Sequence, residues 1–244
     1  MVNVHIHQFA GSAPVDAHAM EQFQKQWASY QKLVDNDYVS HREVGDLLSR
    51  ALNERFAEPF AILDIACGDA SLMKRVLPET KVSHYHGIDL AEPALELAAR
   101  NLEELGFAVD LDRRDFVAAM NDRPEPADVS WCSLSIHHLV IDDKIRLLRA
   151  IRAATNNFVM IYEPTRREGE DRPAFLDRFC AVNRPLWKEL TTEEWNQIES
   201  HVRTSDLPET RSGWIDAGRQ AGYSGSRVIY TDPTDMFCLY RYDV

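Results

Sequence analysis

The sequence predicts an α/β protein built on a doubly wound sheet of seven strands. A short apolar run at 61–65 passes through small residues into a segment with helical character, and Pro78 ends that helix. This strand, tight turn and helix form the nucleotide-binding corner of doubly wound sheets. Strands and helices then alternate up to about residue 163, and a turn signal at 231–235 separates the two strands of a terminal β-hairpin. Five strands and a hairpin give the seven.

Composition limits the class of protein and its partners. The chain has 244 residues, 45% of them apolar, and a formal net charge of -12. Because no predicted element carries a Lys/Arg cluster, we expect no nucleic-acid partner. The four cysteines are far apart and form no C-x-x-C pair, which is typical of reduced thiols and predicts a cytoplasmic location. No apolar run reaches membrane-spanning length, so no membrane partner is expected.

The turn after the first strand indicates the class of ligand. Only Gly68 stands where a dinucleotide fingerprint needs three glycines. Asp64 and Asp69 add negative charge, which disfavours a pyrophosphate and suits a cationic or amine ligand. The stretch 61–70 resembles motif I of class I S-adenosylmethionine (SAM)-dependent methyltransferases, in its "LD-x-x-CG" form. The resemblance implies SAM as cofactor, S-adenosylhomocysteine as product, and cofactor contacts at Asp64, Ala66 and Gly68.

The second predicted strand, 82–88, is followed by a second acidic residue. Asp89 lies 25 positions beyond Asp64, close to the spacing of about 20 at which such sheets place a ribose-binding carboxylate. A carboxylate there accepts two hydrogen bonds from a cis-diol. We therefore expect Asp89 and the adjacent Leu90 at the ribose, although a surface aspartate at a helix start is the simpler alternative.

The third and fourth strands supply further cofactor contacts by resemblance. Asp115 and Phe116 follow the third strand (107–111), where family members place an acidic residue at the adenine amine and an apolar one against the ring. The segment 127–139 ends in Ile-His-His-Leu and is similar to motif IV of small-molecule methyltransferases. It lacks the D/N-P-P-Y/F sequence of adenine N-methyltransferases. The resemblance implies that Ser133 walls the cofactor site.

Three residues at the ends of these strands are candidates for catalysis. His137 and His138 are adjacent and point in different directions, so we expect different roles for them. One would line the acceptor pocket, where an imidazole with a pKa near 6.5 is a plausible base. A structural histidine bonded to the backbone is the alternative for either one taken singly. Glu163 ends the fifth strand (157–162) and would hold an amine acceptor or orient a histidine.

The residues before the first strand form the first predicted unit, an arm and helical lid over 1–57. We expect residues 1–17 to be a loose arm, and two helices to follow, the second with capping-box spacing between Ser40 and Glu43. In the family such a segment folds over the cofactor site. That implies a cofactor contact at Tyr38 and acceptor contacts at Tyr30 and His41. A packing helix pair with solvated polar residues is the alternative.

The remaining residues, 58–244, form the predicted SAM-binding domain, interrupted by an insertion. Residues 164–222 are longer than a simple crossover requires, so we interpret them as a helical cap over the acceptor. Arg166 is expected to bind an acidic group of the acceptor, and Trp187 to contact it. A solvated Arg/Glu loop and aromatic core packing are the alternatives. The resemblance implies that the last strand of the hairpin inserts antiparallel into the sheet.

Together these features predict a SAM-dependent methyltransferase acting on an O or N atom of a small-molecule acceptor. SAM binding with non-methylating chemistry, or a non-catalytic partner role, are the alternatives. No group of residues has the spacing of metal ligands, so no metal is expected. The sequence does not identify the acceptor, and it leaves a homodimer open.

Overall fold

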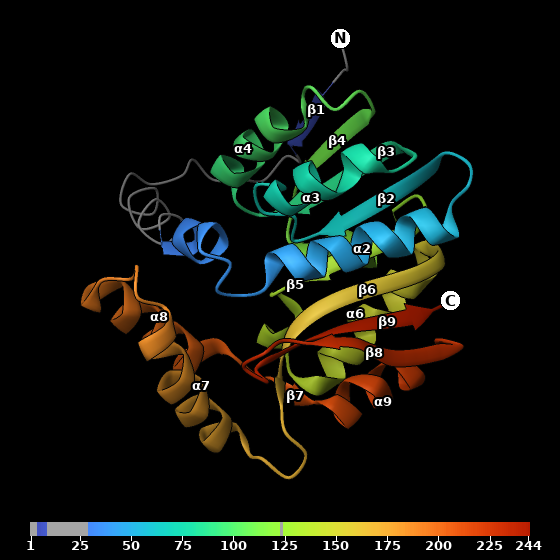
Figure 1. Ribbon diagram of the computed structural model, residues 1–244. Helices are drawn as coiled ribbons and strands as arrows, with labels where there is room; N and C mark the ends of the chain where they lie inside the picture. The colour runs from blue at the N-terminus through green and yellow to red at the C-terminus, as the bar shows by residue number, and fades with distance from the viewer. Residues whose placement is uncertain (1–3, 9–28, 123) are drawn as a thin grey trace.

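The computed structural model describes residues 4–8, 29–122 and 124–244. Its core is one nine-stranded sheet with the order β1-β4-β3-β2-β5-β6-β9-β8, and β7 pairs with β6 off this path (Figure 1). The strands are β1 (Val4–Gln8), β2 (Phe60–Ile65), β3 (Val82–Asp89), β4 (Ala108–Arg113), β5 (Ala127–Ser133), β6 (Thr155–Arg166), β7 (Glu209–Thr210), β8 (Gly225–Thr231) and β9 (Phe237–Asp243). The predicted α/β class, mostly parallel sheet and terminal hairpin are confirmed.

Strand order creates the place where a ligand can bind. From β2 the chain moves outward through β3 to β4, and it then returns to β5 on the other side of β2. The loops that leave β2 and β5 therefore run in opposite directions and leave a crevice between them. In open parallel sheets such a switch point, at the carboxyl ends of the strands, is the usual ligand site. β9 is antiparallel to both of its neighbours, β6 and β8.

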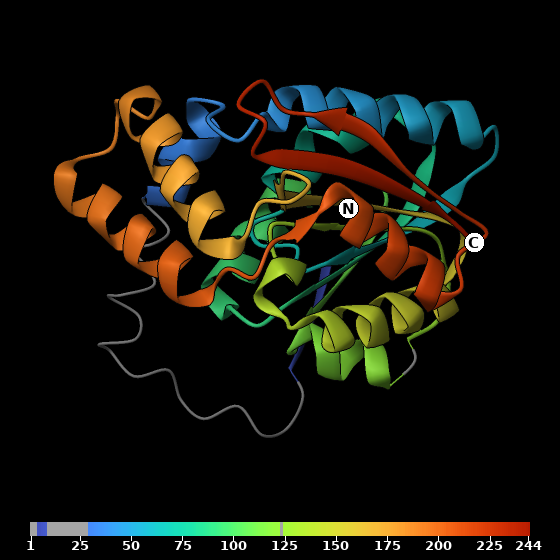
Figure 2. The ribbon, with the colours of Figure 1, turned by 90° about the horizontal axis from the view of Figure 1, so that it is seen from below.

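Helices cover both faces of the sheet. One face carries α2 (His41–Arg55), α3 (Ser71–Val76) and α4 (Glu92–Leu102), and the other carries α5 (Phe116–Asn121), α6 (Ile141–Ala153) and α9 (Arg211–Ala221). Figure 2 shows α2 on one side of the sheet and α6 with α9 on the opposite side. The strands between them are buried on both faces and are rich in β-branched and aromatic residues, as is usual for a parallel sheet covered by helices on both sides. Each face therefore has its own hydrophobic core.

The helical pair α7 (Arg172–Leu186) and α8 (Thr192–Ser205) stands beyond the strand ends, next to residues 29–38 (Figure 2). α8 begins with a capping box: the Thr191 hydroxyl accepts from the Glu194 N–H, and the Glu194 carboxylate accepts from the Thr191 N–H. Lys32 forms an ion pair with Glu194 at 2.7 Å. The N-terminal segment and the cap are thus joined to each other above the crevice.

The N-terminal predictions need three corrections. Residues 4–8 are no loose arm, because β1 pairs in parallel with β4. Most of α2 is a packing helix and no lid, since Val44, Leu48 and Leu52 are buried in the core on the sheet. Ser40 does not cap α2: it has a left-handed backbone (φ 54°) and no capping hydrogen bond from its side chain. The helix instead starts where Asp37 accepts from the Arg42 N–H at 2.9 Å.

Two predictions about the second half also change. β6 does not end at Glu163 but runs on to Arg166, because β9 and β7 continue its hydrogen-bond ladder. The cap is shorter than 164–222: α9 packs on the sheet, and its Trp214 is fully buried in the core beneath it. Only α7 and α8 form the cap. Within the described part of the chain, no helix combines the length and apolar character needed to cross a membrane.

Candidate active site

The turn after β2 has the backbone of a close ligand contact. Ala66, Gly68 and Ala70 all have left-handed backbones, with φ of 56°, 55° and 54°. Glycine adopts this conformation without a steric cost, whereas the Cβ of an alanine crowds the backbone, so the chain is strained at Ala66 and Ala70. A Cβ built on Gly68 would meet nothing within 4 Å, so its backbone borders open space.

That open space is a cavity of about 170 Å³, which we call the corner cavity. It lies at the switch point, between the turn after β2 and the residues that follow β5. The N-terminal segment closes it with Tyr30 and His41. Its walls include Asp64, Ala66, Cys67, Gly68, Asp69, Ala70, Ser71, Trp131, Ser133, Leu134 and Ser135. The predicted contacts Asp64, Ala66, Gly68 and Ser133 are therefore brought together here.

The corner cavity is acidic. Asp64 is 3% exposed, and its carboxylate accepts a hydrogen bond from the Tyr85 hydroxyl at 2.7 Å. Burial raises the pKa of Asp64 to about 7, Tyr85 partly opposes this, and Asp89 and Asp69 add to it. The pKa of Tyr30 is also raised, by burial and by the same three aspartates. A positively charged ligand group would relieve this concentration of negative charge.

His41 can donate a hydrogen bond to a ligand in this acidic cavity. Its side chain is buried, and neither ring nitrogen has a hydrogen-bond partner among the described residues. Burial lowers its pKa to about 4, against the opposing influence of Asp37 and Asp69. The ring is therefore neutral at pH 7 and carries one N–H and one lone pair. Two unpaired buried ring nitrogens are costly, which points to a ligand that meets them.

The other predicted cofactor residues lie outside this cavity, along the neighbouring strand ends. Asp89 accepts from the Gly68 N–H at 2.9 Å and from the Ala91 N–H at 2.8 Å, so it also holds the turn. Leu90 is 66% exposed. Asp115 is exposed and caps α5 by accepting from the Ala118 N–H, and Phe116 packs on the core below. These residues border one edge of the sheet, but the structure does not enclose them.

A second cavity, of about 300 Å³, lies between the sheet and the cap; we call it the aromatic cavity. One end is apolar and the other carries imidazoles and a carboxylate. Tyr30 and Leu134 line both cavities, so the two are neighbours across these side chains. The residues lining the aromatic cavity are Ser29, Tyr30, Leu33, Val39, Leu134, His137, His138, Pro164, Phe179, Trp187, Gln197, Ile198, His201, Val202, Asp206 and Phe237. None of these described lining residues is a lysine or an arginine.

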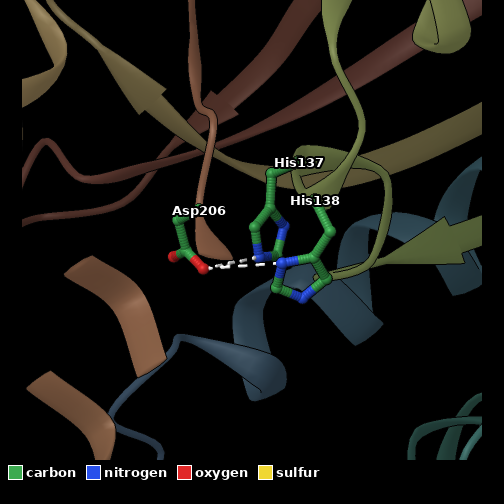
Figure 3. A group of neighbouring side chains, drawn as sticks. All are labelled: His137, His138 and Asp206. Atoms are coloured by element: carbon green, nitrogen blue, oxygen red, sulfur yellow. Dashed lines mark ion pairs between the residues drawn. The ribbon is translucent and has the colours of Figure 1, made fainter. Parts of the chain in front are cut away.

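The polar end of the aromatic cavity is built around Asp206 (Figure 3). Its Oδ1 lies 3.5 Å from His137 Nε2 and 3.6 Å from His138 Nδ1. His201 Nε2 is 4.0 Å from the same oxygen. His137, His138 and Asp206 offer ligand atoms within 4.8 Å of one another, the spacing of a group that could hold a metal ion. The expectation of no metal rested on sequence spacing alone, which cannot detect this cluster.

Glu163 fixes the loop that carries both histidines. It is fully buried and accepts from the backbone N–H groups of Ser135, Ile136 and His137 at 2.9–3.3 Å. It also pairs with His137 Nδ1 at 2.6 Å. Its carboxylate is therefore occupied by the protein itself. This arrangement matches the predicted orienting role and leaves little room for a bound amine.

The two histidines differ in protonation. Burial disfavours the charged form of His137, but Glu163 and Asp206 outweigh it and raise its pKa to about 9. His138 is 36% exposed, and burial together with the neighbouring His137 charge lowers its pKa. At neutral pH His137 is thus the cation and His138 the neutral imidazole. Only the latter has a lone pair free to accept a proton.

Two predicted contacts lie elsewhere. Tyr38 lines neither cavity: its ring stacks on Trp187 with centroids 5.9 Å apart, and its hydroxyl accepts from the Glu189 N–H. Arg166 also lines neither cavity, because its guanidinium donates to the carbonyls of Pro208 and Glu170. Both residues hold the cap in place. Of the residues predicted to contact the acceptor, Tyr30 and Trp187 line the aromatic cavity, and Tyr30 and His41 line the corner cavity.

Sequence reasoning missed Asp206 and Tyr85. Asp206 follows α8 and is far from the histidines in the sequence, so no local pattern connects them. Tyr85 alternates with the other buried residues of β3 and gives no sign of its bond to Asp64. An aromatic hydroxyl at a buried position of a strand is the one available hint, because such a group needs a partner.

Comparison with known proteins agrees with this geometry. Residues 63–157 match the family model described as a methyltransferase domain. No curated protein sequence matches the chain. The structure resembles Synechocystis magnesium protoporphyrin IX methyltransferase, solved with bound SAM, with a TM-score of 0.60 and 10% identity over 96% of this chain and 99% of that one.

Two further structures show the same likeness. A Bordetella parapertussis protein described as a possible exported protein gives a TM-score of 0.61 and 18% identity, over 83% of this chain and 67% of that one. Mitomycin 7-O-methyltransferase gives a TM-score of 0.55 and 18% identity, over 84% of this chain and 54% of that one. The chain therefore spans about half of that protein's length. Residues 63–157 therefore match the methyltransferase-domain family model, and the fold of the chain resembles that of solved methyltransferases.

Proposed function

We propose that the chain binds SAM in the corner cavity and transfers its methyl group to an O or N atom of a small molecule in the aromatic cavity. The observation that carries this proposal is the adjacency of the two cavities across Tyr30 and Leu134. Methyl transfer requires donor and acceptor to meet in line, with water excluded. Two neighbouring cavities of opposite character provide separate places for the two molecules.

The corner cavity fits the amino-acid part of SAM. Asp64 and Asp69 would face the positively charged amine of SAM. The neutral His41 would donate a hydrogen bond to the carboxylate of SAM. The cavity is too small for the whole cofactor, so the adenosine would extend over the exposed edge at Asp89, Leu90, Asp115 and Phe116. Bound there, SAM would supply a methyl group already activated by a positively charged sulfur.

The aromatic cavity indicates the chemistry of the acceptor. Trp187, Phe179 and Phe237 form an apolar wall, and none of the described lining residues is a cation that would bind a carboxylate or phosphate. The carboxylate and imidazole groups of the lining gather around Asp206, where His137, His138 and His201 surround its carboxylate. An apolar, ring-containing molecule with one hydroxyl or amine matches this distribution.

His138 is the proposed proton acceptor. Its Nδ1 lies near Asp206 Oδ1 and the Ser205 carbonyl, so an Nδ1–H would point toward these oxygens and leave the Nε2 lone pair available. Asp206 would then orient the imidazole, as the carboxylate of a triad does. The proton of the acceptor hydroxyl moves to Nε2 as the oxygen becomes methylated.

The first test is calorimetric titration of SAM and S-adenosylhomocysteine into the purified protein and an Asp89→Ala variant. We expect the wild type to bind both and the variant to bind clearly less tightly, because Asp89 holds Gly68. Incubation with SAM and a panel of phenols and aromatic amines, read by mass spectrometry, then tests transfer. Binding of SAM with no methylated product from any acceptor class would favour the non-methylating or partner role.

A further inference from the structure

The segments that form the polar end of the aromatic cavity are held together by hydrogen bonds of the protein itself. The loop carrying His137 and the segment carrying Asp206 are tied together, since the Leu207 N–H donates to the His137 carbonyl at 2.8 Å. The Arg172 guanidinium donates to the Asp206 carbonyl at 2.6 Å, and Lys144 donates to the Leu207 carbonyl. The backbone segments that carry this cluster are therefore held together by contacts outside the cluster.

Asp206 lacks a hydrogen bond that would explain its position. Its side chain is 8% exposed, and Oδ1 has no hydrogen-bond partner among the described residues. The two imidazole nitrogens stand 3.5 and 3.6 Å away, beyond the usual N–H···O distance of about 2.7–3.2 Å. Figure 3 shows both nitrogens turned toward this oxygen. This buried carboxylate oxygen is thus an ion-pair partner of the imidazoles but accepts no hydrogen bond, so its capacity as an acceptor or ligand is not used within the described residues.

The same distances match ligands around a metal ion. Zinc binds histidine nitrogen and carboxylate oxygen at about 2.0–2.2 Å, so two ligands of a tetrahedral ion stand about 3.4 Å apart. The separations of His137 Nε2 and His138 Nδ1 from Asp206 Oδ1 are within 0.2 Å of that value. All three atoms lie within 4.8 Å of one another, so one ion could reach them with small side-chain movements.

Glu163 lies behind His137 and supports it, as a carboxylate outside the three proposed ligands. It contacts the Nδ1 of His137 at 2.6 Å, which leaves Nε2 to face Asp206. Metal-binding histidines regularly donate their other N–H to a carboxylate in this way, because the bond fixes the tautomer and the ring orientation. The carboxylates of Glu163 and Asp206 together also balance the charge of a divalent cation.

We propose that His137, His138 and Asp206 bind one divalent transition-metal ion, with Zn²⁺ as the probe. Two imidazole nitrogens and a single carboxylate favour zinc or cobalt over magnesium and calcium, which prefer oxygen ligands. Three protein ligands leave a coordination position open, as in catalytic zinc sites. The three residues line the aromatic cavity, so the open position would face the acceptor.

This proposal goes beyond methyl transfer, because ion binding can be measured with neither SAM nor an acceptor present. In the metal-free protein His138 remains the proton acceptor. In the loaded protein its Nδ1 is a ligand, and an acceptor oxygen on the ion would lose its proton more readily. Failure of either proposal therefore leaves the other to be judged on its own experiment.

The test begins with full-length protein treated with EDTA and dialysed. Calorimetry with Zn²⁺ alone should show one equivalent bound, and Mg²⁺ under the same conditions should show none. We expect His138→Gln and Asp206→Asn each to weaken Zn²⁺ binding by about a hundredfold or more, since even second-layer changes cost 10–100-fold. The asparagine keeps the shape of Asp206, and circular dichroism verifies that each variant is folded.

Surface histidines provide the matched control. His84 and His86 pair with Asp110 and Asp112 on β3 and β4, away from both cavities. The double variant His84→Ala/His86→Ala should bind Zn²⁺ as the wild type does. Absence of binding by the folded wild type would overturn the proposal. So would binding that survives in both His138→Gln and Asp206→Asn, or that is lost in the double variant.

Discussion

Asp64 allows the electrostatics of the corner cavity to be tested through stability. Its pKa is raised from 3.8 to about 7 by burial. In the unfolded chain this carboxyl ionises above pH 4, while in the native protein it keeps its proton up to about pH 7. The unfolded state therefore binds fewer protons in this window, and this contribution to stability is lost as the pH rises from about 4 to 7. Above pH 7 the loss is complete and stays constant.

We expect Asp64→Asn to stabilise the ligand-free protein at pH 8. About three pKa units at about 1.4 kcal/mol each correspond to about 4 kcal/mol, from which the burial of the new amide subtracts about 1–2 kcal/mol. A gain of about 2–3 kcal/mol should raise Tm by about 5–10 °C in a chain of this size. At pH 5 most of the gain should vanish, because wild-type Asp64 is then protonated when folded.

The assay is thermal unfolding from pH 5 to pH 8, with calorimetric titration of SAM at pH 8. Asp216→Asn is the matched control, since it removes the same charge from an exposed side chain of α9. The variant should also bind SAM at least about tenfold more weakly, because the charge facing the cation is gone. An equal Tm change at pH 5 and pH 8, or a lower Tm at pH 8, would refute a buried, costly charge at this position.

Four further predictions concern the histidine loop and the aromatic cavity. His138→Ala should lower kcat by about 10²–10⁴-fold and leave the Kd for SAM unchanged; equal loss of both would exclude the base role. In the wild type the rate should fall only at acidic pH, below the ordinary imidazole value of about 6.5, because burial and the neighbouring His137 lower the pKa of His138 and the base gains a proton there; a rate that stays constant down to the pH at which the protein unfolds would contradict this. Glu163→Ala should destabilise the protein by about 3–5 kcal/mol in denaturant unfolding, since it leaves three N–H groups and His137 unpaired, and Glu163→Gln should cost less. Trp187→Ala should raise KM for the acceptor and leave SAM affinity unchanged in calorimetry, because Trp187 lines only the aromatic cavity.

Much of the cofactor half could be predicted from local sequence. The turn at Gly68 and the acidic residue after β3 follow from short-range rules: small residues where the backbone is left-handed, and a carboxylate at a strand end. Errors arose where pairing partners are distant. β1 gives no strong signal by itself and is ordered through β4, and the extension of β6 depends on β7 and β9.

The acceptor half was predicted less well, for a physical reason. Tyr38 and Arg166 have the residue types of ligand contacts, but their polar atoms are taken up by Glu189 and Pro208 in the cap. Which partner a polar side chain finds depends on which segment packs beside it, and residue type does not determine this. For the same reason His41 lines the corner cavity, although it was expected at the acceptor site.

The sequence by itself determined the order of strands and helices, the small-residue turn, and the acidic residues at the ends of β2 and β3. These depend on periodicity and backbone conformation within a few residues. Only the tertiary structure decided that Tyr30 and Leu134 separate two cavities and that Asp206 faces His137 and His138. Those contacts join segments that are distant along the chain, and they exist because α7 and α8 pack over the carboxyl ends of the strands.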